Sequence, residues 1–173
     1  MAEQSTPTAT SGAMPRPQRS GVIQVDDRLC MTCRECEVAC SLAHERECNP
    51  ALSRVRIVFD DFSPGSPDMR VCKQCDWPAC YYACAAVNEE QALRIDPVTG
   101  ARYVLESACR GCGACARACP LTPERSVIAL KKGGRKRISF KCDLCKDRPA
   151  GPVCVQVCPG KALTYIPAAE RKR

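Results

Sequence analysis

Cysteine is the residue type whose number and spacing indicate chemistry in this chain. Seventeen of the 173 residues are cysteine, and sixteen of them form four groups of four. The groups are Cys30, Cys33, Cys36 and Cys40; Cys72, Cys75, Cys80 and Cys84; Cys109, Cys112, Cys115 and Cys119; and Cys142, Cys145, Cys154 and Cys158. The first and third groups have the spacing C-x2-C-x2-C-x3-C, and the other two lengthen only the middle gap. This spacing is the cysteine run that binds 4Fe-4S clusters.

The spacing has a physical reason. Three thiolates two residues apart can wrap one loop around a cubane cluster, and each sulfur then reaches a different iron. Helices are expected over residues 37–45 and 116–118, and they carry the fourth cysteine away from the first cube toward a second one. Pro120 and Pro159 follow the fourth cysteine of the last two groups and help to end the helix. The groups therefore work in pairs, and sixteen cysteines predict four 4Fe-4S clusters.

Disulfides and zinc are the alternatives to iron-sulfur clusters. Residues 1–20 hold no apolar run that could serve as a signal peptide, and the chain has no run of 18 apolar residues. We therefore expect a cytoplasmic protein with no membrane span, where reduced cysteines bind metal more often than they form disulfides. Zinc sites use two cysteine or histidine pairs, and a chain with one histidine and four such runs fits that pattern poorly.

Composition and charge agree with a metal-filled interior. Leu, Ile, Val and Phe make up about 18 % of the residues, which is too little for an ordinary apolar core. The formal net charge is +7, but four oxidised clusters with their thiolates bring about −2 each, which leaves the loaded chain close to neutral. A nucleic-acid-binding function is therefore the least favoured class. Without its clusters the chain should not fold.

Short strands and turns are expected between the cysteine groups. Hydrophobic alternation and turn residues predict hairpins around residues 97–100 and 131–135. The expected strands are 22–25, 54–59, 92–96, 102–105, 127–130, 137–140 and 162–166. The predicted fold class is α+β, with two nested ferredoxin-like modules around the four clusters. The expected divisions are a flexible arm over 1–20, an outer module formed by 21–62 with 136–167, an inner module over 63–135, and a tail over 168–173.

Residues 22–166 resemble the four-cluster ferredoxin-type electron-transfer subunits of molybdenum and tungsten oxidoreductases. The stretch from Cys30 to Glu45, with Asn49-Pro50 and Ser53-Arg54, is most similar to the small iron-sulfur subunits of the tungsten aldehyde:ferredoxin oxidoreductase family, which includes benzoyl-CoA reductases. Ser41 and Ala85 depart from the proline that many members carry after the fourth cysteine. The chain also lacks a membrane-anchoring tail, which argues against the membrane-bound formate dehydrogenase and nitrate reductase types.

The resemblance implies that the cysteine groups pair in a nested way, the first with the fourth and the second with the third. The implied ligand sets are Cys30, Cys33, Cys36 and Cys158 (set 1); Cys142, Cys145, Cys154 and Cys40 (set 2); Cys72, Cys75, Cys80 and Cys119 (set 3); and Cys109, Cys112, Cys115 and Cys84 (set 4). Spacing alone leaves a sequential pairing open.

The resemblance also implies a role in relaying single electrons. One partner would be a pterin-containing catalytic subunit, most plausibly an aldehyde oxidoreductase, and the other a flavin or NAD-linked subunit or a ferredoxin. Contacts between copies could extend the path. The alternatives are a subunit of a carbon monoxide dehydrogenase, formate dehydrogenase or hydrogenase system, and a free polyferredoxin. No nucleotide loop or nucleophile motif is present, so we predict an electron carrier with no catalytic residues.

Several residues outside the sixteen carry weaker signals. His44 is expected at the surface or at an interface, with a hydrogen bond to a cluster sulfur as the alternative. Cys48 is expected to be a free thiol. The basic run over 131–137 is expected to be a solvated hairpin, with docking to an acidic partner as the alternative. The remaining expectations are that Trp77, Tyr81 and Tyr82 cover a cluster and that Arg171 to Arg173 fray.

Overall fold

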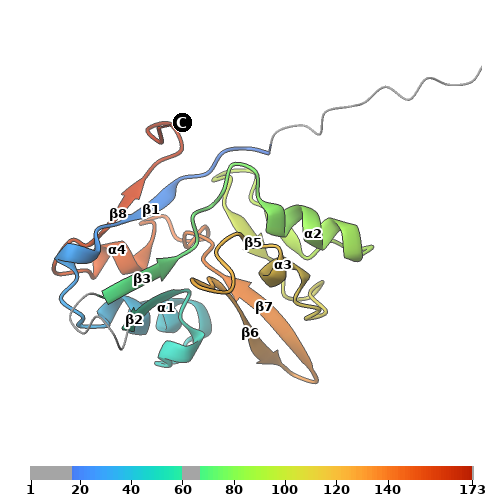
Figure 1. The fold of residues 1–173 in the computed structure, drawn as a ribbon, viewed down its shortest axis with the longest axis horizontal. Coiled ribbons are helices and arrows are strands. Elements are labelled where there is room, and N and C mark those ends of the chain that lie inside the picture. The colour runs from blue at the N-terminus through green and yellow to red at the C-terminus, as the bar shows by residue number, and fades with distance from the viewer. Residues whose placement is uncertain (1–16, 60–66, 173) are drawn as a thin grey trace, which may run out of the picture.

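The computed structural model describes residues 17–59 and 67–172, and it consists of short strands and helices joined by cysteine-bearing loops (Figure 1). The helices are α1 (Glu35–Glu45), α2 (Ala79–Val87), α3 (Ala114–Arg117) and α4 (Val153–Gln156), with single 3-10 turns at Asp27–Leu29 and Pro50–Leu52. The strands are β1 (Val22–Val25), β2 (Val55–Phe59), β3 (Pro67–Val71), β4 (Leu93–Ile95), β5 (Arg102–Val104), β6 (Ile128–Gly133), β7 (Lys136–Lys141) and β8 (Leu163–Ile166).

The strands pair two by two in antiparallel ribbons. β1 pairs with β8, with Val22 opposite Ile166, so the two ends of the described chain meet. The other ribbons join neighbours in sequence, β2 with β3, β4 with β5 and β6 with β7. The seven strands expected from the sequence are confirmed. β3 was missed because Pro67 and Asp68 disfavour strand structure, and it forms because the buried face of β2 needs a partner.

The helices begin earlier than the sequence suggested. α1 starts at Glu35 and α3 at Ala114, so each contains the third cysteine of its group and not only the residues after it. Arg34 and Gly113 precede these helices in a left-handed conformation, which turns the chain into the helix at once. α2 was not expected, and it carries Cys80 and Cys84 four residues apart on one face.

The buried residues fall into two clusters, and cysteines are prominent in both. One cluster gathers residues from β1, α1, β2, β3, α4 and β8, together with Cys72, Ala101, Cys142 and Leu144. The other gathers residues from the middle of the chain, between Cys84 and Ile138. Figure 1 shows α1, α4 and the β1–β8 ribbon on one side of the molecule and α2, α3 and β5 on the other. The few large apolar residues of the chain are thus divided between two small cores.

The ends of the described chain are held in place. Ser20 is fully buried, and Arg19 forms an ion pair with Asp76 (3.3 Å). Arg171 donates to the Gln74 carbonyl oxygen at 2.8 Å, so the expectation of a frayed end does not describe this residue. Residues 1–16 of the predicted arm, the predicted module boundary at 62/63 and Arg173 lie outside the described residues. Among the helices of the described ranges, none has the length and apolar character needed to cross a membrane.

Candidate iron-sulfur sites

The four cysteine loops share one backbone feature. In each group the residue two positions after the first cysteine has a positive φ: 57° at Thr32, 47° at Gln74, 72° at Gly111 and 61° at Leu144. A left-handed residue within such a turn directs successive backbone N–H groups into one concavity, an arrangement found at many iron-sulfur sites. At Gly111 no side chain would fit, because a Cβ would collide with the Arg137 carbonyl oxygen.

Backbone N–H groups also point at individual sulfur atoms. Four cysteine sulfurs each accept a bond from a main-chain nitrogen in the described structure. These are Arg54 N to Cys40 Sγ (3.3 Å), Gln74 N to Cys72 Sγ (3.4 Å), Leu93 N to Cys84 Sγ (3.4 Å) and Ser139 N to Cys109 Sγ (3.4 Å). Such bonds favour the thiolate over the thiol, and the thiolate is the form that binds metal.

Thiols from the two ends of the chain act on one another electrostatically. Burial, and after it Glu37 and the thiols of Cys158, Cys30 and Cys33, together raise the pKa of Cys36 to about 12. Residues of groups one and four, which are more than a hundred positions apart in the sequence, are therefore neighbours in space. Cys36 and the three cysteines that act on it, Cys30, Cys33 and Cys158, are the four members of set 1.

Thiols of groups one and four also interact around Cys154. Burial raises the pKa of Cys154 far above its usual range, and the thiols of Cys40, Cys145 and Cys36 add to the shift. Cys142 is buried, and burial, followed by Cys154 and Cys72, raises its pKa well above the usual range. The members of set 2 thus lie near one another and beside members of sets 1 and 3.

The middle groups line two small cavities. One cavity is bordered by Cys72, Cys75, Cys80 and Cys119. The other is bordered by Cys84, Cys109, Cys112 and Cys115. Burial raises the pKa of Cys80 to about 12, with contributions from the thiols of Cys72, Cys119 and Cys115. The structure thus brings groups two and three together, with sets 3 and 4 each around one cavity.

The donor set fits iron-sulfur clusters. All seventeen cysteines are free thiols, so none is consumed in a disulfide. Two nitrogens of buried Arg102, Nε and Nη2, have no partner among the described residues, and this side chain borders the cavity of set 3. Cluster sulfides could accept bonds from both nitrogens. Cys48 is exposed and stands apart from the four sets, as expected of a free thiol.

His44 was expected at the surface or at an interface, and the structure places it in a mostly buried charged network near the Cys40 sulfur, which agrees with the alternative of a bond to a cluster sulfur. Its side chain is 12 % exposed, and its Nε2 lies 3.0 Å from Asp143 Oδ1. Its Nδ1 lies 2.9 Å from the Cys40 carbonyl oxygen and 3.8 Å from Cys40 Sγ. Asp143 also accepts from Arg54 Nη1 at 2.7 Å. Burial lowers the pKa of His44, but its bonds to Asp143, Cys145 and Cys40 outweigh burial and raise it to about 12.

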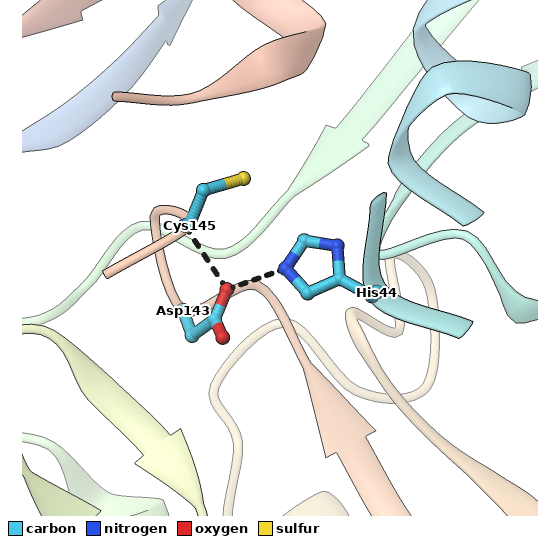
Figure 2. Close-up of side chains that lie close together, drawn as sticks. All are labelled: His44, Asp143 and Cys145. Atoms are coloured by element: carbon cyan, nitrogen blue, oxygen red, sulfur yellow. Dashed lines mark hydrogen bonds and ion pairs between the residues drawn. The ribbon is translucent and has the colours of Figure 1, made fainter. Parts of the chain in front are cut away.

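Figure 2 shows His44, Asp143 and Cys145 around one point. Their potential ligand atoms all lie within 4.8 Å of one another, a grouping that can hold a metal ion. Because Cys145 already belongs to set 2, we interpret the histidine and carboxylate as neighbours of that cluster and not as a separate metal site. Sequence reasoning missed Asp143 and Arg54, and only the position of Asp143 beside Cys142 could have pointed to it.

A second polar region lies between sets 2 and 3. Lys141 is 2 % exposed, and its Nζ donates to the carbonyl oxygens of Arg102 (2.6 Å) and Cys142 (2.8 Å). Gln74 is fully buried and donates to the Cys142 carbonyl oxygen at 2.8 Å, while its Oε1 accepts from Arg102 N at 2.8 Å. Burial lowers the pKa of Lys141, but the thiols of Cys72, Cys80 and Cys142 outweigh it and raise the pKa. No sequence pattern predicted this junction.

The expected aromatic cover is only partly present. Trp77 is 55 % exposed, so it does not seal a site in the described structure. Tyr81 packs on the second buried cluster and meets Tyr82 edge to face, with ring centroids 5.4 Å apart.

Residues 67–166 match the family model for the 4Fe-4S dicluster domain. The chain belongs to this family. It is 33 % identical over 160 residues to YsaA of Escherichia coli (strain K12), a candidate electron transport protein, with 87 % of this chain and 92 % of YsaA covered. It is 43 % identical over 130 residues to the polyferredoxin-like subunit of an aliphatic sulfonate oxidoreductase from Pyrococcus furiosus, which covers 75 % of this chain and 66 % of that subunit. Formate hydrogenlyase subunit 2 of Escherichia coli (strain K12) is 30 % identical, with 82 % and 79 % covered.

Among solved structures, the BamBC complex of benzoyl coenzyme A reductase aligns with 87 % of this chain and 81 % of that chain. The TM-score is 0.47 and the identity 24 %, and a likeness this distant carries no functional conclusion. The family and the relatives identify the chain as an iron-sulfur electron transport protein that binds 4Fe-4S clusters, related to subunits of oxidoreductase and hydrogenlyase systems.

Proposed function

We propose that the chain is an electron-transfer subunit with four 4Fe-4S clusters held by sets 1 to 4, in the nested pairing. The observation that carries this proposal is the grouping of the thiols: groups one and four are electrostatic neighbours, while groups two and three share two cavities. The N–H groups aimed at the sulfurs support the same assignment. The two nested ferredoxin-like modules follow from this pairing.

The sets lie in a row. Cys36 of set 1 acts on Cys154 of set 2, Cys72 of set 3 acts on Cys142 of set 2, and Cys115 of set 4 acts on Cys80 of set 3. These contacts support the linear order 1, 2, 3, 4. When bound, 4Fe-4S clusters accept and release single electrons. The chain's own residues hold the clusters at short separations, exclude water from the middle of the row and supply fixed positive charge beside it.

We further propose a tungsten or molybdenum pterin enzyme as the catalytic partner, with an aldehyde oxidoreductase as the leading candidate and a flavin subunit or ferredoxin at the other end. The similarity of residues 30–54 to subunits of tungsten enzymes supports this choice. The relative named as a subunit of formate hydrogenlyase supports a second candidate, a hydrogenase or formate-linked complex. Tungsten and molybdenum analysis of the complex purified anaerobically from its native cells, together with assays of aldehyde, formate and hydrogen oxidation, distinguishes the two.

Iron analysis and electron paramagnetic resonance test the cluster number. The anaerobically purified chain is expected to hold about sixteen irons and to show four reducible clusters, whereas fewer than about twelve irons would rule out the four-cluster proposal. Cys40→Ser tests the pairing. Nested pairing predicts that this variant loses the signal of the cluster bound by Cys142, Cys145 and Cys154. Loss of the cluster bound by Cys72 and Cys75 instead would show sequential pairing.

A further inference from the structure

One end of the proposed row of clusters opens at the surface. Cys112 of set 4 is exposed, in contrast to Cys84, Cys109 and Cys115, which are buried. Because electron transfer needs close approach, an exposed ligand at the end of a row marks a place where a partner can meet the chain. The surroundings of Cys112 therefore indicate what kind of partner fits.

The basic hairpin of β6 and β7 lies against the loop that carries Cys112. Gly111 packs so closely on the Arg137 backbone that a Cβ would not fit, and Lys136 Nζ donates to the Ser107 carbonyl oxygen at 3.2 Å. On the loop itself, Arg117 Nη1 donates to the Cys112 carbonyl oxygen at 3.1 Å. A segment that is more than twenty residues away in sequence thus borders the loop of the exposed cysteine.

We define the basic collar as the exposed cations on this loop, helix α3 and the hairpin. Its members are Arg110, Arg117, Lys132, Arg135, Lys136 and Arg137. None of the six forms an ion pair with a carboxylate within residues 17–59 and 67–172, whereas the neighbouring Lys131 pairs with Glu45 and Glu106 at 2.6 Å each. The collar is therefore a surface of uncompensated positive charge around an exposed cluster ligand.

The opposite end of the row has a different surface. Cys33 of set 1 is also exposed, but beside it Leu29 and Met31 are 49 % and 60 % exposed. The exposed cations at this end, Arg28 and Arg34, pair with Asp26 (2.9 Å) and Glu37 (3.7 Å). Exposed apolar side chains favour a stable contact with another subunit. A patch of positive charge instead attracts an acidic partner over a distance, which favours fast association and a short-lived complex. The two ends are thus fitted to different kinds of partner.

We propose that the basic collar is the docking surface for an acidic, freely diffusing one-electron carrier protein, which exchanges electrons with the cluster of set 4. This inference rests on the proposed electron-transfer function. The exchange moves one electron, so reduction of the chain is matched by oxidation of the carrier, and no proton or bond changes are required. A cluster-bearing acidic protein meets both requirements, since its negative surface matches the collar and its own cluster supplies the electron.

The test uses the full chain with its clusters and two reductants, a reduced bacterial two-cluster ferredoxin of low isoelectric point and reduced methyl viologen. K132E/R135E/K136E reverses charge on the hairpin, and R46E/K161E/K172E makes the same change in net charge at exposed cations outside the collar. At low ionic strength we expect the hairpin variant to lower the second-order rate with ferredoxin at least tenfold, an effect that fades above about 0.5 M salt. The control variant should lose less than about twofold.

The other results are equally informative. Equal slowing by both variants, or no slowing by the hairpin variant, would overturn the docking surface. Tight binding of the wild-type chain to a labelled 20-bp DNA duplex at about 0.15 M salt, lost in the hairpin variant, would reassign the collar to nucleic acid. Methyl viologen separates the two proposals: if it also fails to reduce the wild-type chain, the electron-transfer function itself is wrong. Unchanged iron content shows that each variant has kept its clusters.

Discussion

The network around His44 and the junction around Lys141 are both buried and both touch cysteine ligands, but they differ in charge balance. In the network, the three carboxylates of Asp143, Glu45 and Glu106 pair with His44, Arg54 and Lys131. In the junction, Lys141 donates to two carbonyl oxygens and bonds to the Cys72 side chain, with no carboxylate partner in the described ranges. A buried unpaired ammonium is costly unless opposite charge lies nearby. The balanced region can therefore keep partial local structure when the clusters are removed, whereas the junction depends on the negative charge of the thiolate-bound clusters.

Removal of iron should produce the largest difference in local stability between the network around His44 and the junction around Lys141. After anaerobic chelation, hydrogen exchange is expected to lose protection throughout β5 and β7, because Lys141 then keeps its desolvation penalty without the compensating charge. Peptides from α1 and the start of β2 should keep partial protection, since their ion pairs lie within the protein. Equal loss in both regions would show that charge balance does not distinguish them.

Asp143→Asn should have the next largest effect, because it leaves His44 and Arg54 without their shared carboxylate. Breaking a buried ion pair costs about 3 kcal/mol, which corresponds to a fall in the anaerobic thermal midpoint of about 10 °C. Asp147→Asn is the matched control, because the Asp147 side chain is 83 % exposed and its pair with Lys146 contributes little. If both variants melt alike, the network is not a structural support.

Lys141→Met should change electron affinity more than stability. Lys141 interacts with the side chains of Cys72, Cys80 and Cys142. Removing this unit positive charge would lower the midpoint potential of a cluster held there by roughly 100 mV at an effective dielectric constant of about 20, because the reduced form loses stabilisation. Redox titration followed by electron paramagnetic resonance measures this shift. Lys132→Met, on the exposed side of the same ribbon, should shift the potential by less than about 20 mV. Equal shifts in the two variants would show that the buried charge of Lys141 does not set the midpoint potential.

The smallest effect expected is a pH dependence from His44. Its pKa is raised to about 12 in the folded chain, so its contribution to stability is complete below pH 6.5 and declines as the pH rises from there toward 12. The neighbouring Asp143 has a lowered pKa, so its contribution is present above about pH 3.8 and is lost in acid. Between pH 7 and 9 the thermal midpoint of the wild type should therefore fall more steeply than that of His44→Gln. Parallel slopes would contradict the charged state of His44.

Much of the site was predictable from the sequence because the cysteines carry a local signal. Two-residue gaps determine which thiols share a loop, and hydrophobic alternation around turns predicted the β4–β5 and β6–β7 ribbons. The left-handed residue was not predictable in three of the four loops, since Thr32, Gln74 and Leu144 give no indication of a positive φ. The starts of the helices were missed for the same reason, because a left-handed Arg34 has no propensity signature.

The sequence by itself determined the chemistry of this protein: soft thiolates in iron-sulfur spacing, too few large apolar residues for an ordinary core, and no catalytic constellation. Only the tertiary structure decided which charged residues surround those thiolates. His44 meets Asp143 across 99 positions, Lys141 becomes buried between two cysteine sets, and the hairpin is brought beside Cys112. The physical reason is range: ligand spacing is a property of neighbouring residues, whereas burial and charge balance depend on segments that only folding brings together.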